Sequence, residues 1–307
     1  MVQNSMQNMQ INKVTKFCCK TKGKQPPFVE KGRANQQASM QIGGAVMAIT
    51  VHPVLPGVYH LSDQMGVCQT LLVGEREALL VDAGYGLEDL RPVIARITQL
   101  PYRLILTHGH HDHVLGARWF PECYMFPEDR EDFAEYTAAP TRKRILASAK
   151  NNGLAVDEEA YLSAAIPEPR PLSEQTIDLG GLTAQIIHVP AHTPGSCVVY
   201  VKERQLLLTA DDWNPCTWAF FPKALPAQVF RSNVTKLFSL PFENVLCSHR
   251  PSLYPRAAMQ AFFDGITDEA LKTAPRVIIG GWEHTNTHEA TPAEGQVFVF
   301  DYDKLQL

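Results

Sequence analysis

The sequence lacks a long apolar segment and a pattern of paired cysteines, and each absence excludes a class of protein. No apolar run reaches the length of a membrane span, and the first residues lack the apolar core of a secretory signal. The seven cysteines show neither disulfide spacing nor a C-x-x-C pair. Cys68, Cys197 and Cys247 lie in or beside apolar runs, so we expect reduced core cysteines in a cytoplasmic protein.

The sequence also lacks a Gly-x-Ser-x-Gly nucleophile segment and a dense basic tract with interleaved aromatic residues. Residues 1–46 hold seven Lys or Arg and one acid, Glu30, so this segment carries +6 and leaves −10 on the remainder of a chain with net charge −4. Binding to a phosphate backbone normally requires a positive surface. We therefore expect a small-molecule substrate, no nucleic-acid partner and no membrane, with a homodimer as an assembly to consider.

Residues 1–46 differ in composition from the rest of the chain, being rich in Gln, Asn and Lys with little hydrophobic periodicity. This predicts a disordered tail, or a mis-assigned start with the true one at Met47, more than a basic arm for nucleic acid or anionic lipid. Deleting the segment is expected to leave metal content and activity unchanged. Residues 47–307 are expected to form one domain, because a chain of 307 residues with 45% hydrophobic content can bury a large single core.

One short segment gathers side chains that bind metals. Four of them occur within six positions: His108, His110, Asp112 and His113. Imidazole nitrogens and a carboxylate oxygen suit zinc and, less selectively, iron or manganese. The apolar run before them predicts a buried strand over 104–107, which would present the cluster on a loop at the strand's end. Gly109 allows the backbone to turn tightly there.

Further candidate ligands occur later in the chain, each after a short apolar run that predicts a strand. These residues are His192, Asp211 and His249. A catalytic zinc usually takes three protein ligands, and a two-metal site needs a group that bridges. Since every candidate follows a predicted strand, the same edge of the fold is expected to present them all.

Asp82, which follows the apolar run 79–81, completes five motifs in a fixed order. On these motifs the chain resembles the metallo-β-lactamase fold superfamily, which includes glyoxalase II, acyl-homoserine lactonases and many metal-dependent hydrolases. The resemblance covers roughly residues 47–300. It implies an α/β (α+β) fold arranged as a four-layer αββα sandwich.

The resemblance also implies two divalent metal ions, expected to be zinc, with manganese or iron as alternatives. The implied ligands of one ion are His108, His110 and His192, and those of the other are Asp112, His113 and His249. Asp211 would bridge the two ions, and Asp82 would orient the ligands from behind. Two motifs depart from the usual pattern, because Ala210 and Ser248 stand where glycine is typical.

The chemistry expected of such a site is hydrolysis of an ester-type bond in a small molecule, a thioester or a lactone. Two cations lower the pKa of a shared water towards neutrality, and Asp112 would hold the resulting nucleophile in line as the catalytic residue. A phosphodiesterase or nuclease is a less favoured alternative, because the body of the chain is acidic. An iron-dependent redox enzyme of the same fold is another, although a complete second ligand set argues for hydrolysis. A non-catalytic metal-binding protein is the last alternative.

The coarse pattern alternates strands with helices. Strands are predicted over 57–61, 69–73, 78–81, 104–107, 183–189, 197–201, 206–209, 245–247 and 296–300. Helices are predicted over 87–100, 113–120, 127–136, 141–151, 226–240 and 256–271. Residues from about 129 to 171 form a helical insertion that would either cap the metal cleft or line its rim.

The loop after Asp211 suggests a substrate pocket. Trp213 and Trp218 could line it, with Asn214 as a polar anchor, and the alternative is that the aromatic residues pack in the core. Among the remaining histidines, His111 and His60 are expected to be structural. His284 and His288 are expected in a surface loop.

Overall fold

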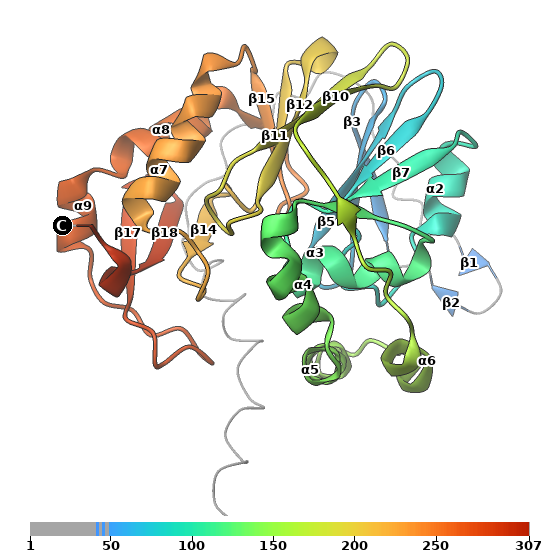
Figure 1. Cartoon of the computed structure of the whole chain (residues 1–307), viewed down its shortest axis with the longest axis horizontal. Helices are drawn as coiled ribbons and strands as arrows, with labels where there is room; N and C mark the ends of the chain where they lie inside the picture. Colours follow the sequence, from blue (N-terminus) through green and yellow to red (C-terminus); the bar gives the residue numbers. More distant parts are fainter. Residues whose placement is uncertain (1–40, 43–44, 47–48, 307) are drawn as a thin grey trace, which may run out of the picture.

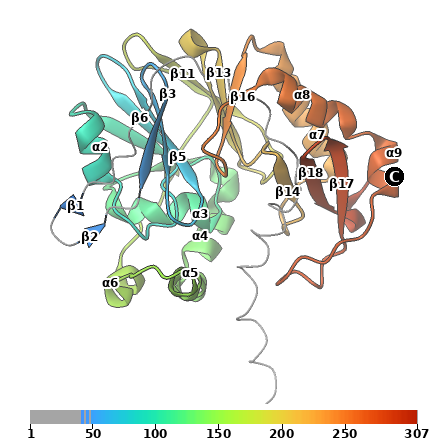
Figure 2. The ribbon, with the colours of Figure 1, turned by 180° about the vertical axis from the view of Figure 1, so that it is seen from behind.

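A computed structural model describes residues 41–42, 45–46 and 49–306, and it has four layers (Figure 1). Two large sheets pack face to face, and helices cover both outer faces. The helix α2 (Arg91–Ile97) lies outside the first sheet, while α7 (Ala227–Thr235) and α8 (Arg256–Gly265) lie outside the second (Figures 1 and 2). The αββα sandwich implied by the sequence motifs is therefore confirmed.

The first sheet has seven strands in sequence order. They are β3 (Thr50–Leu55), β4 (Val58–Ser62), β5 (Cys68–Val73), β6 (Ala78–Val81), β7 (Tyr102–Ile105), β8 (Tyr124–Met125) and β9 (Arg170–Pro171). The pairings from β3 to β6 are antiparallel, and those from β6 to β9 are parallel. Because β6 and β7 run in parallel, the segments that follow them emerge at the same edge.

The second sheet has six strands, and a smaller one has three. The six are β10 (Gln175–Asp178), β11 (Thr183–His188), β12 (Cys197–Val201), β13 (Leu206–Ala210), β15 (Asn244–Cys247) and β16 (Tyr254–Pro255). The three are β14 (Cys216–Ala219), β17 (Thr287–Ala293) and β18 (Gln296–Asp301). The pair β13–β15 is parallel, so its two carboxyl ends also share one edge.

The part of the core between the two sheets explains why the strands are nearly continuous apolar runs. Side chains of both sheets meet between them, Leu79 and Ile105 from the first and Val199 and Leu208 from the second. The other face of each sheet is buried as well, against the helices. Strands covered on both faces favour apolar residues at nearly every position, as the fully buried β12 and β13 show.

The helices between β8 and β9 are α4 (Arg130–Thr137), α5 (Ala139–Asn151) and α6 (Glu158–Ser163), which agrees with helices predicted in this insertion. The single helix expected over 256–271 is two, α8 and α9 (Asp268–Thr273). The chain breaks there because Thr267 caps a new helix, its Oγ1 accepting from Ala270 N at 3.0 Å.

Two further expectations are corrected by pairing between distant segments. The loop after Asp211 contains β14, which pairs with β18 some eighty residues later and was not visible in local periodicity. His288 lies in β17 and not in a surface loop, with Nδ1 donating to Ala274 O at 2.6 Å. The proposed tail, residues 1–46, lies almost wholly outside the described residues. No described helix is long and apolar enough to cross a membrane.

Candidate metal centre

The site lies where the parallel strands of both sheets end. The short helix α3 (His111–Val114) follows β7 and supplies Asp112 and His113, and His110 stands at its N-terminal boundary. His192 follows β11, Asp211 follows β13 directly and His249 follows β15. All seven sequence-predicted ligands are therefore brought together at one edge of the sandwich.

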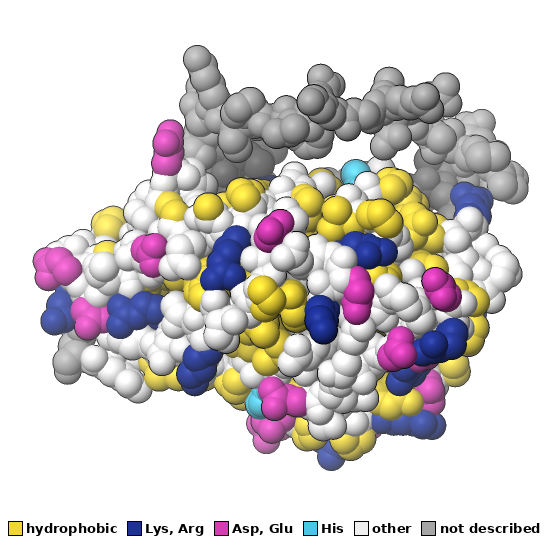
Figure 3. Space-filling model, turned by 90° about the horizontal axis from the view of Figure 1, so that it is seen from above, with side chains coloured by type: hydrophobic (Ala, Val, Ile, Leu, Met, Phe, Trp, Pro, Cys, Tyr) yellow, Lys and Arg dark blue, Asp and Glu magenta, His cyan; other side chains and the backbone are white. Residues whose placement is uncertain are grey.

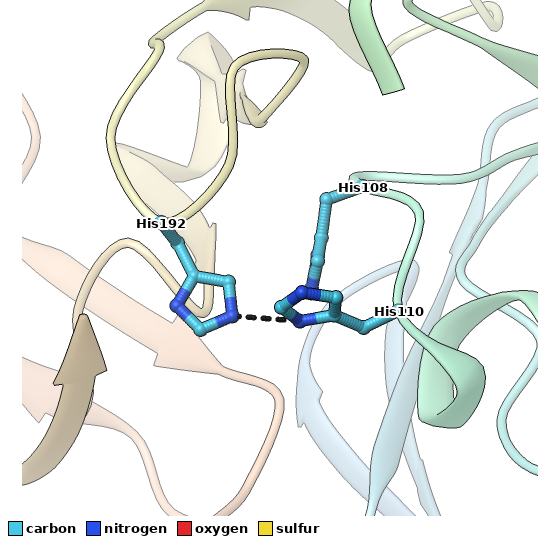
Figure 4. Close-up of side chains that lie close together, drawn as sticks. All are labelled: His108, His110 and His192. Atoms are coloured by element: carbon cyan, nitrogen blue, oxygen red, sulfur yellow. Dashed lines mark hydrogen bonds between the residues drawn. The ribbon is translucent and has the colours of Figure 1, made fainter. Parts of the chain in front are cut away.

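Three histidines converge into the first group: His108, His110 and His192 (Figure 4). All three are buried, and their ligand atoms lie within 4.8 Å of one another. His192 Nε2 lies 3.0 Å from His110 Nδ1. The two loops that carry these residues are separated by 82 positions in the chain, so only the fold brings the nitrogens together.

The second group combines Asp112, His113 and His249, again with ligand atoms within 4.8 Å of one another. Asp112 Oδ2 lies 3.8 Å from His113 Nε2 and 3.7 Å from His249 Nε2. His249 is the most accessible ligand, since its side chain is 32% exposed while that of His113 is fully buried. This group therefore faces the opening of the site.

Asp211 lies between the two groups. Its Oδ2 is 3.0 Å from His249 Nε2, 3.6 Å from His113 Nε2 and 3.7 Å from His192 Nε2. One carboxylate thus approaches histidines of both groups, which is the arrangement that a bridging ligand requires.

The donor set fits two divalent cations. Within the described residues, three buried polar atoms of the centre have no hydrogen-bond partner, namely His108 Nε2, His113 Nε2 and Asp211 Oδ1. Leaving a buried polar atom unsatisfied costs free energy, so such atoms call for an explanation. Nitrogen and oxygen atoms of these types are the ligands that zinc and related cations prefer.

The protein orients the rings through their other nitrogens. His113 Nδ1 donates to Asp82 Oδ2 at 2.9 Å, and His192 Nδ1 donates to Trp218 O at 2.7 Å. His108 Nδ1 lies 3.2 Å from Thr107 Oγ1. These contacts fix the tautomers and leave Nε2 of each ring directed at the centre.

Electrostatics divide the ligands into two kinds. Burial lowers the pKa of His108 and of His110 well below the ordinary value, so both imidazoles are neutral and ready to bind a cation. Burial opposes ionisation of Asp211, but the neighbouring His249 and His113 outweigh it and hold the pKa of this carboxyl well below its usual range. Asp211 is therefore an anion surrounded by imidazoles.

Asp82 occupies the supporting position that the sequence predicted. It is buried, and its backbone adopts a left-handed φ of 66°, which bends the chain after β6. Its Oδ1 accepts from Thr107 N at 2.7 Å, and Thr107 Oγ1 donates to the same carboxylate. Through these bonds and the bond from His113, one aspartate fixes both ends of the histidine-rich segment.

Asp129 is a supporting residue that the sequence reasoning missed. It is fully buried and joins the two loops of the first histidine group. It accepts from Gly109 N at 2.9 Å, from Thr193 Oγ1 at 2.6 Å and from Gly195 N at 2.6 Å. A Cβ on Gly195 would lie 2.6 Å from Asp129 Cγ, so the glycine permits this approach. Asp129 lies in the segment 127–136, which the sequence predicted to be helical, and nothing in that local pattern indicated that it would join two loops.

His60 supports the loop of His249. The sequence predicted a structural histidine here, and the ring is 1% exposed. Its Nε2 lies 3.2 Å from Cys247 O and 3.3 Å from Arg250 O, on either side of His249, and its Nδ1 lies 2.9 Å from Thr70 Oγ1. Burial lowers the pKa of His60 to about 4, so the ring is neutral at physiological pH.

The predicted substrate pocket needs correction. Trp213 has no exposed surface, packs at 5.4 Å from the ring of Tyr254 and belongs to the core under the second sheet. Asn214 is buried, and its Oδ1 accepts from Cys216 N at 2.8 Å to stabilise the turn before β14. Trp218 is half-buried and contributes its carbonyl to His192. Apolar burial and turn formation therefore account for the first two residues.

His111 also has a role that the sequence did not reveal. The sequence predicted only a structural histidine here, and its Nδ1 lies 3.1 Å from Asp112 Oδ1. The ring contacts Tyr85 at 5.6 Å and Tyr136 at 5.4 Å. His111 thus orients Asp112 from the side opposite His113 and His249.

Comparison with known proteins agrees with the geometry. The family model of the metallo-beta-lactamase superfamily matches residues 65–249. This span contains all seven candidate ligands and ends at His249. The chain is 28% identical over 165 residues to an uncharacterized protein of Mycobacterium tuberculosis (strain ATCC 25618 / H37Rv), covering 47% of this chain and 67% of that protein. It is 27% identical over 151 residues to hydroxyacylglutathione hydrolase GloC of Haemophilus influenzae, covering 47% of this chain and 65% of that protein.

Among solved structures, the chain is similar to a metallo-beta-lactamase from Erythrobacter litoralis. The TM-score is 0.50 at 16% sequence identity, and the match covers 70% of this chain and 95% of that one. At this level of identity the likeness shows the fold alone.

Proposed function

Because this chain belongs to the metallo-beta-lactamase superfamily, we propose that it is a two-metal hydrolase that cleaves an ester-type bond, a thioester or a lactone, in a small molecule. The proposal rests first on Asp211, whose Oδ2 lies within 3.7 Å of a histidine nitrogen from each group. A carboxylate placed between two groups of histidines can serve an ion in each group, as a two-metal centre would use it.

The first cation would be held by His108, His110 and His192, and the second by Asp112, His113 and His249, with Asp211 shared. We propose zinc, because imidazole with a minority of carboxylate suits it best. Two bound divalent cations would supply an activated water at neutral pH and Lewis-acid polarisation of the scissile carbonyl.

Asp112 is the residue that we propose to act on the attacking water. Its Oδ1 is oriented by His111, and its Oδ2 faces His113 and His249. Burial would raise the pKa of Asp112, but the neighbouring histidines outweigh burial and hold it well below the usual range. An ionised carboxylate fixed from both sides can accept a hydrogen bond from the water and hold the water in line.

The choice of a small ester rests on charge and on relatives. Acidic and basic side chains are interspersed on the face in Figure 3, and the chain outside residues 1–46 carries −10, which does not favour a phosphate backbone. The relative from Haemophilus influenzae is named a hydroxyacylglutathione hydrolase, which acts on a thioester. We extend that bond type, and not its particular substrate, to this chain.

The experiment that tests the proposal combines metal analysis with a substrate panel. Two zinc ions per chain and turnover of thioesters or lactones are expected, with loss of turnover in Asp211→Ala and His110→Ala at unchanged circular dichroism. Full activity of the doubly substituted chain would exclude the proposed centre. One iron per chain, without hydrolysis, would instead point to oxygen chemistry.

A further inference from the structure

Two aromatic side chains from distant segments contact the first histidine group, and a third packs against one of them. Tyr136 comes from α4, Phe221 from the loop between β14 and α7, and Trp282 from the loop before β17. The Phe221 ring lies 4.8 Å from that of His110 and 5.3 Å from that of His192. Tyr136 lies 4.9 Å from His110, and Trp282 lies 5.4 Å from Phe221.

These three side chains are half-buried, unlike the aromatic residues of the core. Trp213 and Phe220, close in sequence to Phe221, are 0% and 1% exposed. Half-buried rings beside candidate metal ligands present apolar surface to whatever enters the site, and aromatic rings give the largest apolar contact area per side chain.

The loop that carries Phe221 is held in place by the half-buried side chain of Lys304. Lys304 Nζ donates to Phe221 O at 2.7 Å, to Pro222 O at 2.8 Å and to Ala224 O at 3.0 Å. Three carbonyls bound to one ammonium leave the loop little freedom, so the backbone that carries the ring is held in place before any ligand arrives.

A second lysine joins this loop to α4. Lys223 Nζ lies 3.1 Å from Asp132 Oδ1 and 3.0 Å from Glu131 Oε2. The bridge holds Phe221 and Tyr136 on the same side of His110.

We propose that Tyr136, Phe221 and Trp282 form the specificity surface of the site and bind an apolar acyl group, aromatic or a medium aliphatic chain, of the substrate. This inference rests on the proposed hydrolase function and adds to it the chemical class of the acyl portion. The reacting carbonyl would lie toward the ligands, and the remainder of the acyl group would lie against the three rings.

The test compares two thioesters that share one leaving group, acetyl and phenylacetyl, on the zinc-loaded full-length chain. Phe221→Ala is expected to lower kcat/KM for the phenylacetyl substrate at least about tenfold, as loss of a hydrophobic contact does, and to leave the acetyl substrate within about threefold. An equal loss on both substrates would overturn the proposal.

A matched control separates specificity from folding. Phe238 is also half-buried but lies on the outer core, 5.3 Å from the Arg256 guanidinium. Phe238→Ala is expected to keep the ratio of the two kcat/KM values unchanged. If the ratio shifted as far in Phe238→Ala as in Phe221→Ala, the effect would be due to loss of stability, and the proposal would be overturned.

A binding measurement keeps the inference testable without turnover. Calorimetry with phenylacetate and with acetate on the zinc-loaded protein should give tighter binding of phenylacetate, weakened at least about tenfold by Phe221→Ala. If no thioester is cleaved, the hydrolase proposal fails while this binding difference still supports the aromatic surface. Equal binding of phenylacetate and acetate would overturn the proposed specificity surface, even if the protein hydrolyses a thioester.

Discussion

At the residue scale, the ligands depend on side chains that never touch a metal. Asp129 illustrates this, because a single carboxylate accepts from Gly109 N, Thr193 Oγ1 and Gly195 N and so sets the distance between two loops. Burial raises its pKa, while the three donors act in the opposite direction. The first histidine group is therefore positioned by a buried acid rather than by the strands alone.

Replacing Asp129 with Asn should weaken metal binding at the first histidine group. The amide keeps one acceptor oxygen but turns an NH2 toward at least one of the donors, so the His110 and His192 loops separate. Loss of such a supporting contact typically costs 10- to 100-fold in metal affinity. Cobalt titration followed by visible absorption measures it, with the exposed neighbour Glu128→Gln as the control. Unchanged cobalt affinity in Asp129→Asn would contradict this role.

His60 should make stability depend on pH between about 6.5 and 4. Its pKa falls from 6.5 in the unfolded chain to about 4 in the folded one, so the unfolded state binds the proton more readily as pH falls. The wild type should lose roughly 3 kcal/mol through this group on going from pH 7 to pH 4. In urea titrations, the free energy of unfolding of His60→Gln should fall correspondingly less over this pH range. That of the exposed His284→Gln should fall as much as in the wild type. Parallel pH profiles for wild type and His60→Gln would contradict the assignment.

At the element scale, the site depends on how closely the segment after β7 packs on the loop after β6. Gly116 follows α3, and its N donates to Gly84 O at 2.9 Å. A Cβ on Gly116 would lie 1.8 Å from Ala83 O, which is impossible without movement of the backbone. Ala83 N in turn donates to His113 O at 2.9 Å, so this movement would reach a candidate ligand.

Gly116→Ala should therefore lower both stability and metal affinity. Inserting a methyl group into a packed contact typically costs 1–3 kcal/mol, and a backbone contact is at the upper end of this range (~3 kcal/mol). Urea unfolding and zinc titration measure the two effects. Gly153→Ala is the control, because nothing lies near its Cβ and only its positive φ of 78° is strained. It should lose stability but keep its zinc affinity; equal zinc affinity in both variants would contradict the expected coupling.

Sequence reasoning at this scale succeeded where the signal is local. Ligand-rich motifs after apolar runs identified the residues that the structure brings together, because a strand's end and a turn are encoded over a few residues. It failed for β14 and for Trp213, since their partners, β18 and Tyr254, are distant in the chain. The surface formed by Tyr136, Phe221 and Trp282 could not be predicted for the same reason, as three segments meet there only after folding.

At the scale of the whole molecule, the candidate ligands join two halves of the sandwich. Asp112 and His113 follow the first sheet, whereas His192, Asp211 and His249 follow strands of the second. Cations bound between them would link both halves and would bind the folded chain in preference to the unfolded one. Metal content and global stability are then coupled.

Removing the metals should consequently lower the free energy of unfolding of the whole chain. For one site with free metal 1,000-fold above its Kd, the loss is about 4 kcal/mol, and a second ion adds to it. Thermal unfolding of zinc-loaded and chelator-treated protein measures the difference. His192→Ala should show a smaller difference than wild type, because one of its ion sites loses a ligand while the other keeps all of its own. If chelation left the unfolding temperature of the wild type unchanged, the ions would not link the two halves, and the apolar core and the supporting hydrogen bonds would hold the seven residues in place without them.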